Sequence, residues 1–218
     1  ADGDGFGTAC DCNDADASIN QLTADLPDPQ VLDSNCDGID GNKYEAVFVS
    51  ADGTAAVEDT DTGNPTNDIN AALEYAQAQG FDVFFETGDY NIAEIVLQDG
   101  VSLFGGFSPS FLQRDVTGDV YPTRLINNQS SDDASALTID SMTNEITIGG
   151  FVIENDSTDE NQSALYVKNS HVVLQSNKFV GNEAVNDETL LKVEDAAVSI
   201  QGNQFYGNSK AQTVGLLA

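Results

Sequence analysis

The alternation of apolar and polar residues near the end of the chain repeats with a fixed period. The segment LYVKNSHVVLQSNKFVGN, residues 165–182, aligns without a gap on LKVEDAAVSIQGNQFYGN, residues 191–208. Each copy holds three short runs in which apolar residues alternate with polar ones, the period of a β-strand that buries one face. The pattern predicts a parallel solenoid with three short strands per repeat, in which each coil stacks on the last.

Looser copies precede these two. An apolar pair at 146 and 148 precedes its counterpart at 172 and 174 by the same offset that separates the two full copies. A pair at 137 and 139 precedes its counterpart at 165 and 167 by a slightly longer one. The segment VSLFGGF, residues 101–107, resembles ITIGGF, residues 146–151. We therefore expect the extra length between them, residues 108–136, to form a coil with a long loop insertion.

Stacking would place identical side chains over one another. Phe179 would stack on Phe205 inside the coils, whereas Lys178 should matter little to stability. Asn pairs at the corners would share side-chain amide hydrogen bonds as ladders. These ladder positions are Asn177 over Asn203 and Asn182 over Asn208.

The chain before residue 108 offers one strand-like run, Ala46 to Ser50, and one good helix at about residues 67–79. Thr66 or Asn67 would cap the helix, and Gly80 would end it. Its apolar stripe consists of Ile69, Ala72, Leu73 and Ala76.

Composition divides the chain near Asn42. Residues 1–42 hold ten Asp, all three Cys and no Lys or Arg, whereas residues 43–218 hold every basic residue. A segment of about 40 residues with so few apolar side chains needs disulfides or metal to fold. The sequence thus predicts a small loop-rich module at residues 1–42 and an all-β domain at residues 43–218.

The net charge of -30 excludes nucleic acid as a partner, because phosphate binding requires basic side chains. No apolar run is long enough for a transmembrane helix. The chain starts at Ala1 without Met, as expected for a mature secreted product or a trimmed chain. Its last residues, VGLLA, would begin a further coil, so we expect either continuation beyond Ala218 or docking of another copy on the open coil.

The repeats, together with the helix before them, resemble the right-handed parallel β-helix superfamily that includes pectate-lyase-like proteins. The resemblance covers about residues 44–218. It implies that the helix near residues 67–79 caps the open end of the core. The superfamily contains lyases, hydrolases, adhesins and structural fibres, so the resemblance is specific for fold and not for function.

The acidic module carries two stretches with the spacing of calcium loops, in which oxygen ligands recur at every second residue. With Gly5 as the turn glycine, Asp2 and Asp4 take positions three and five, the Phe6 carbonyl position seven and Asp11 position twelve. Position one would precede the chain.

The second loop has the more complete spacing. Asp33, Asn35 and Asp37 take positions one, three and five, Gly38 takes position six, and the Ile39 carbonyl takes position seven. Position twelve is Tyr44 instead of Glu, so another carboxylate must close the loop. Asp14 and Asp16 are the expected suppliers.

The order of DGDG, DCNDAD and NCDGID resembles thrombospondin type 3 repeats, and more closely the metal-binding repeat of secreted bacterial surface proteins. The resemblance implies Ca²⁺ held by Asp2, Asp4, Asp11, Asp14, Asp16, Asp33, Asn35 and Asp37. The three cysteines lack the CxxC spacing of zinc sites. A disulfide from Cys12 to Cys36 is our first choice, and Cys10 to Cys36 is the alternative.

No constellation of catalytic residues emerges from the repeats. His171 aligns with Ala197 and is interpreted as an exposed corner residue. The loop at residues 109–124 gathers aromatics and cations, which we expect to pack on the coils with Arg114 and Arg124 paired to Asp115 or Asp119; a sugar-binding patch is the alternative.

Three functions are compatible with these observations. The first is an extracellular or cell-surface protein with a structural, adhesive or filament-forming role and without catalysis. The second is a polysaccharide lyase or hydrolase, and the third is a polysaccharide-binding module.

Overall fold

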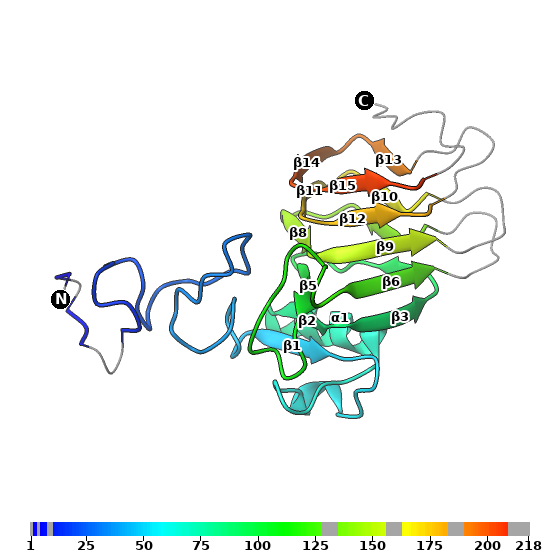
Figure 1. Ribbon diagram of the computed structural model, residues 1–218. Coiled ribbons are helices and arrows are strands. Elements are labelled where there is room, and N and C mark those ends of the chain that lie inside the picture. The colour runs from blue at the N-terminus through cyan, green and yellow to red at the C-terminus, as the bar shows by residue number, and fades with distance from the viewer. Residues whose placement is uncertain are drawn as a thin grey trace.

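The structure, a computed structural model, describes residues 2–3, 5–7, 11–127, 135–155, 163–182 and 190–208. It is mostly β, with three parallel sheets, one α-helix and one 3-10 helix among these residues (Figure 1). A first sheet runs in the order β1, β2, β5, β8, β11, β14, a second in the order β3, β6, β9, β12, β15, and a third in the order β4, β7, β10, β13. From β2 onward, successive strands of the chain thus belong to the first, second and third sheets in turn.

The strands are short, as the repeat predicts. The first sheet contains β1 (Ala46–Val49), β2 (Asp82–Glu86), β5 (Leu103–Phe107), β8 (Ile146–Gly149), β11 (His171–Gln175) and β14 (Ala197–Gln201). The second contains β3 (Gly88–Ile92), β6 (Thr123–Asn127), β9 (Phe151–Asn155), β12 (Lys178–Val180) and β15 (Gln204–Tyr206). The third contains β4 (Ile95–Val96), β7 (Leu137–Asp140), β10 (Leu165–Lys168) and β13 (Leu191–Glu194).

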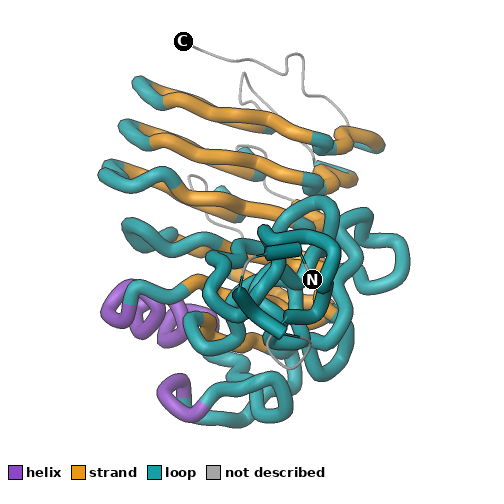
Figure 2. Tube along the Cα trace, turned by 90° about the vertical axis from the view of Figure 1, so that its left-hand side faces the viewer, coloured by secondary structure: helices purple, strands orange, loops and turns teal. Residues whose placement is uncertain are grey.

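The strand registers confirm the alignments seen in the sequence. Leu165 pairs with Leu191 in the following coil and with Leu137 in the preceding one. Leu103 pairs with Ile148, which confirms that the segment at 101–107 belongs to an earlier coil. Between β5 and β6 the chain leaves the stack for the loop at residues 108–122 and returns at Thr123 opposite Phe151. The coils therefore form a solenoid-like stack, which Figure 2 shows from the side.

Both predicted ladders are present. Asn177 Oδ1 accepts the N–H of Phe151 at 3.1 Å, and its Nδ2 donates to the Ile148 carbonyl at 2.8 Å. The Asn177 N–H in turn donates to Asn203 Oδ1 at 2.8 Å, and the equivalent bond joins Asn182 to Asn208 at 2.9 Å. Each corner is thus tied to its neighbour by a side chain as well as by the strands.

Helix α1 (Ile69–Gln79) covers one end of the core. Ala72, Leu73 and Ala76 are buried in the same cluster as the inward residues of the coils. Gly80 ends the helix in the left-handed conformation, as expected, but neither Thr66 nor Asn67 is the N-cap. Asp68 is the N-cap, because its carboxylate accepts the Ala71 N–H at 3.0 Å. The 3-10 helix η1 (Val57–Asp59) precedes α1.

The far end of the described stack is more open. Leu174 is fully buried, whereas Ile200, its partner in β14, is 41% exposed. The expectations about a further coil or a docked copy concern residues 209–218, which lie outside the described residues.

Phe179 and Phe205 stack with their ring centres 4.9 Å apart, but only Phe179 is fully buried. We expect Phe179→Ala to destabilise the protein by about 3–5 kcal/mol, because it leaves a cavity between coils. Phe205→Ala should cost less. Urea unfolding midpoints would measure both, with exposed His171→Ala as the control; equal midpoints for Phe179→Ala and His171→Ala would contradict the packing.

Lys178 is unsuitable as that control, contrary to the expectation from the sequence. Its Nζ lies 2.7 Å from Asp119 Oδ1, and only 10% of its side chain is exposed. The loop after β5 covers it, since Gly118 lies beside its methylene groups.

Asp82 should make stability depend on pH. Burial raises the pKa of Asp82 to about 6. Because the folded pKa exceeds the unfolded value, stability falls as pH rises from about 4 to about 6. Asp82→Asn should remove this loss, making the variant more stable at pH 7 by up to about 3 kcal/mol and similar to the parent below pH 4. Urea unfolding at both pH values tests this, and exposed Glu74→Gln is the control that should leave the pH profile unchanged.

Candidate metal centre

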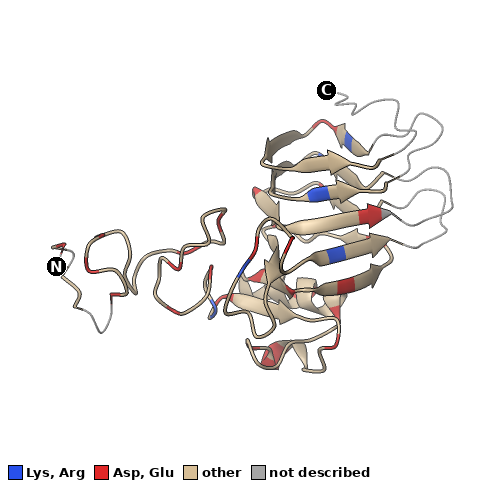
Figure 3. Ribbon diagram, viewed as in Figure 1, with Lys and Arg blue, Asp and Glu red and all other residues tan. Residues whose placement is uncertain are grey.

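Where it is described, the segment that precedes β1 consists of loops with many acidic residues, which Figure 3 shows in red. Several side-chain hydrogen bonds hold one of its turns, at residues 33–38. Asp33 Oδ1 and Asn35 Oδ1 both accept the N–H of Asp37, at 3.0 and 2.9 Å. Asp33 Oδ2 accepts the N–H of Gly38 at 2.9 Å, and Gly38 has a φ of 102°, which favours glycine. The structure thus brings together the side-chain oxygens at the first and third loop positions.

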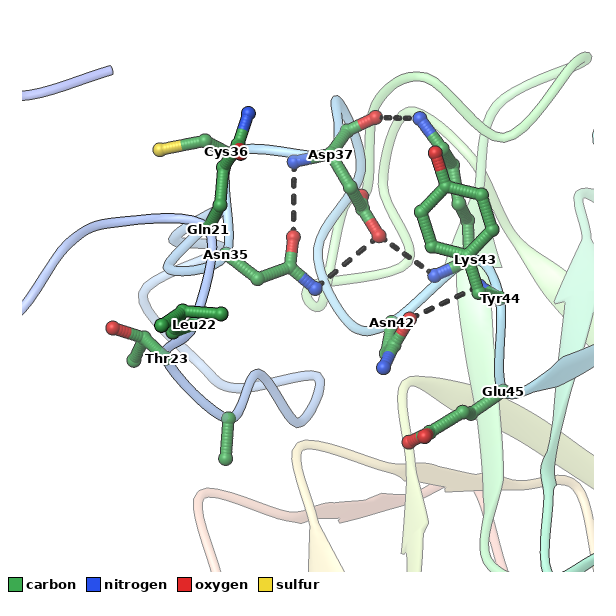
Figure 4. A pocket seen from close by; sticks show the side chains of 11 residues that line it. Gln21, Leu22, Thr23, Asn35, Cys36, Asp37, Asn42, Lys43, Tyr44 and Glu45 are labelled. Atoms are coloured by element: carbon green, nitrogen blue, oxygen red, sulfur yellow. Dashed lines mark hydrogen bonds between the residues drawn. The ribbon is translucent and has the colours of Figure 1, made fainter. Parts of the chain in front are cut away.

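Asp37, at the fifth position, is held from several sides. Its Oδ1 accepts the Ile39 N–H at 3.1 Å. Its Oδ2 accepts the Lys43 N–H at 2.8 Å, as Figure 4 shows. Lys43 Nζ also donates to the Asp37 carbonyl oxygen. Ile39, whose carbonyl was assigned to position seven, is 2% exposed and packs with Phe48 among the aromatic residues beside the coils. The loop is therefore anchored to the all-β part of the chain.

Figure 4 shows the cleft of about 610 Å³ next to this loop. Asn35, Asp37 and Glu45 line it together with Tyr44, which occupies the twelfth loop position and is 73% exposed. Glu45 directly follows the position where a calcium loop has its closing Glu. Sequence spacing alone did not single it out, because it is displaced from the expected position by one residue.

Asp14 and Asp16 do not take part in this cleft. Both are exposed, and Asp16 accepts hydrogen bonds from the N–H and hydroxyl of Ser18, at 3.1 and 2.7 Å. The hydroxyl bond is the leading cause that lowers the pKa of Asp16. Neither carboxylate is among the residues that line the cleft beside the Asp33–Asp37 turn.

The first loop is described only in part. Asp2 and Phe6 are half-buried, whereas Asp4 lies outside the described residues. Asp11 is 5% exposed, and its Oδ1 accepts the Asn13 N–H at 2.8 Å. Its Oδ2 is buried without a hydrogen-bond partner within the described part of the chain. A buried carboxylate oxygen in this position fits a bound cation, because an unsatisfied charge is costly to bury.

Cys12 and Cys36 form a disulfide, with their Cα atoms 5.6 Å apart. This is the first of the two pairings considered from the sequence; Cys10 lies outside the described residues. The bond ties the start of the DCND segment to the Asp33–Asp37 turn. It thereby joins the two candidate loops covalently.

Asp25 is a functional group that sequence spacing missed. It is 6% exposed, and its Oδ2 accepts the N–H groups of Ser34 and Gly41, at 3.1 and 3.2 Å. Burial raises the pKa of Asp25 to about 6, with smaller contributions from the charges of Asp40 and Asp33. Asp25 thus stabilises the second loop through hydrogen bonds to its backbone. No motif could have revealed it, because its partners are backbone groups distant in sequence.

The contact that joins the loops to the coils was also missed. Arg114 Nη1 lies 2.7 Å from Asp40 Oδ2, and only 1% of either side chain is exposed. Arg114 Nε also donates to the Gly105 carbonyl at 2.9 Å, and Nη1 donates to the Asp28 carbonyl at 3.4 Å. Burial raises the pKa of Asp40, and the guanidinium opposes this shift. One buried cation therefore contacts the acidic segment and the stack at the same time.

This arrangement corrects the expected pairing of the loop at residues 109–124. Neither Arg114 nor Arg124 pairs with Asp115 or Asp119. Arg124 lies 2.6 Å from Glu154 Oε2 and 3.6 Å from Asp89 Oδ1. Because Arg114 is buried, it cannot serve the sugar-binding patch considered for this loop.

The remaining cations of the described residues are engaged as well. Lys168 and Lys192 both lie within 4 Å of the Glu194 carboxylate, at 3.9 and 3.8 Å. His171, as expected, is exposed and pairs with Ala197 in the strand register. Where the chain is described, no Lys or Arg projects without a partner as an exposed catalytic base would.

Within the described ranges, no three His, Cys, Asp or Glu side chains form a group that could hold a metal ion. None of the helices in those ranges has the length and apolarity needed to cross a membrane. The chain matches no protein-family model, no curated protein and no solved structure. Its function has to be inferred from its own residues.

The Asp40–Arg114 pair generates a stability prediction. Asp40→Asn leaves a buried guanidinium without its counter-charge and should cost about 3–5 kcal/mol. The double variant Asp40→Leu with Arg114→Met should lose less stability than the sum of the losses in Asp40→Leu and in Arg114→Met, because it removes both charges. Urea unfolding of the single and double variants would measure this coupling. Additive losses would show that the two side chains do not act as a pair.

Proposed function

We propose that this chain is a right-handed parallel β-helix with a calcium-stabilised N-terminal module, and that it serves a structural or adhesive role at the cell surface or outside the cell. The main support is the stack itself. From β2 onward, successive coils contribute one strand to each of three parallel sheets, in a register that shifts only between Phe84 and Glu86 among the described strands, and parallel β-helices share this architecture. The helix α1 on the first coils would be the N-terminal cap.

The donor chemistry of the acidic loops fits calcium, which prefers six to eight oxygen ligands from carboxylates, amides and carbonyls. Asp33, Asn35, Asp37 and the Ile39 carbonyl would hold one ion. Glu45, which lines the same cleft, would replace Asp14 and Asp16 as the closing carboxylate. Two of these proposed ligands, the amide oxygen of Asn35 and the carbonyl of Ile39, are not carboxylates. The proposed site therefore differs from a cluster of acidic side chains.

Asp11, with its buried and unsatisfied Oδ2, would be the central ligand of a second ion in the first loop. The sequence assigns Asp2, Asp4, Phe6, Asp14 and Asp16 to the same region. Bound calcium would supply positive charge among carboxylates that otherwise repel one another. The Cys12–Cys36 disulfide would keep both loops in reach of their ions and indicates an oxidising compartment.

The engaged cations support a role without catalysis. A lyase of this fold would need an exposed Arg or Lys as base, and the described ones are occupied by carboxylates or carbonyls. Screening the protein against a glycan array, with and without calcium, tests this assignment. Turnover of any glycan would contradict it, and binding without turnover would favour the polysaccharide-binding module.

Calcium should stabilise the N-terminal loops specifically. We expect excess chelator to lower the melting temperature or to expose residues before β1 to protease, because uncompensated carboxylates repel one another. Asp37→Asn and Glu45→Gln should each weaken calcium binding at least tenfold by calorimetry. Exposed Asp52→Asn is the matched control and should leave the affinity unchanged.

Two results would contradict the assignment. The first is an identical melting curve and protease pattern in calcium and in chelator. The second is an equal effect of the three substitutions on calcium affinity. If only Asp37→Asn loses affinity, the loop remains assigned to calcium, but Glu45 is not its closing ligand.

A further inference from the structure

A second cleft, of about 620 Å³, lies at the end of the stack between β1, η1 and α1. Its lining includes four aromatic side chains, those of Tyr44, Phe48, Tyr75 and Phe81. Phe48 is 1% exposed and is held edge-on by buried aromatic neighbours, so this part of the lining is rigid. The volume lies within the range of small-molecule pockets, so the cleft has room for a side chain of a partner together with its neighbouring atoms.

The polar part of the lining is predominantly acidic. Glu58 and Asp61 both line the cleft and are exposed. Neither carboxylate takes part in an ion pair with any cation in the part of the chain that the structure describes. Asp61 Oδ1 accepts the Gly63 N–H at 2.7 Å, which fixes the direction of this carboxylate. The cleft thus combines aromatic rings with two carboxylates that lack a counter-charge.

The ammonium group of Lys43 already contacts one of the aromatic rings in this lining. Lys43 Nζ lies over the ring of Tyr44, 5.1 Å from its centre, at the boundary between the two clefts. An ammonium group over an aromatic ring is attracted by the negative face of the ring. Lys43 remains attached to the Asp37 carbonyl, so it does not neutralise Glu58 or Asp61.

We propose that this cleft binds the ammonium group of a lysine side chain carried by a basic partner protein. Charge complementarity selects this occupant, because carboxylates and aromatic rings together favour a cation and the whole chain carries a net charge of -30. Another protein is the expected source, because in the described part of the chain Lys168, Lys178 and Lys192 are already paired with carboxylates.

The proposal can be tested on the full chain by following backbone amide shifts in NMR during titration with the peptide acetyl-Gly-Gly-Lys-Gly-Gly-amide. The same peptide with Nε-acetyl-lysine is the matched ligand control. Shifts should be confined to residues lining the cleft, and the acetylated peptide should bind at least tenfold more weakly. Glu58→Gln should weaken binding about two- to fivefold, as expected for loss of an exposed ion pair.

Asp59→Asn removes the neighbouring carboxylate that does not line the cleft and should bind the lysine peptide like the parent protein. Lys43→Met should strengthen binding, because it removes the competing ammonium from Tyr44. Equal binding of both peptides, shifts outside the cleft, or weaker binding by Lys43→Met would overturn the proposal. A neutral oligosaccharide that shifts the cleft residues when the lysine peptide does not would assign the cleft to sugars instead.

Discussion

Backbone hydrogen bonds between parallel strands join each coil to its neighbours. The rest of the structure depends on keeping these strands in register. A strand in the middle of the stack must keep register with two others at once, so residues of similar shape recur at equivalent positions. Phe179 lies on Phe205, and Asn177 binds the backbone of the coil before it while Asn203 binds that of Asn177. Corners need these side chains, because the strand ladder is interrupted there and polar groups would otherwise be buried without partners.

The guanidinium of Arg114 joins the acidic segment before β1 to the stack of coils. Arg114 lies on a loop that leaves the stack, yet it contacts Gly105 in one coil, Gly149 in the next and Asp40 in the acidic segment. The guanidinium carbon of Arg114 also lies over the rings of Phe104 and Phe107, 5.4 Å from each ring centre. A buried cation with so many partners is specific to one geometry, because any displacement leaves a charge unsatisfied.

Periodicity explains which features the sequence could predict. The strand registers, the Asn corners and the buried stripe of α1 all repeat or alternate, so a slip would have moved apolar residues to the surface. The Asp40–Arg114 pair joins residues 74 positions apart and occurs once, so it leaves no periodic signal. Asp25 binds backbone groups, which any residue supplies. The helix cap was misplaced because Thr66, Asn67 and Asp68 all suit that position, and only the geometry distinguishes them.

The position of Arg114 also sets an order of assembly. The acidic segment is made before its buried partner Arg114, which follows Asp40 by 74 residues, and the carbonyl of Gly149 that completes the contact follows later still. During synthesis from the N-terminus, the acidic segment therefore cannot complete this contact until the coils that contain Gly105 and Gly149 have formed. A segment that is made before the coils thus reaches its final place only after the coil that contains Gly149 has formed.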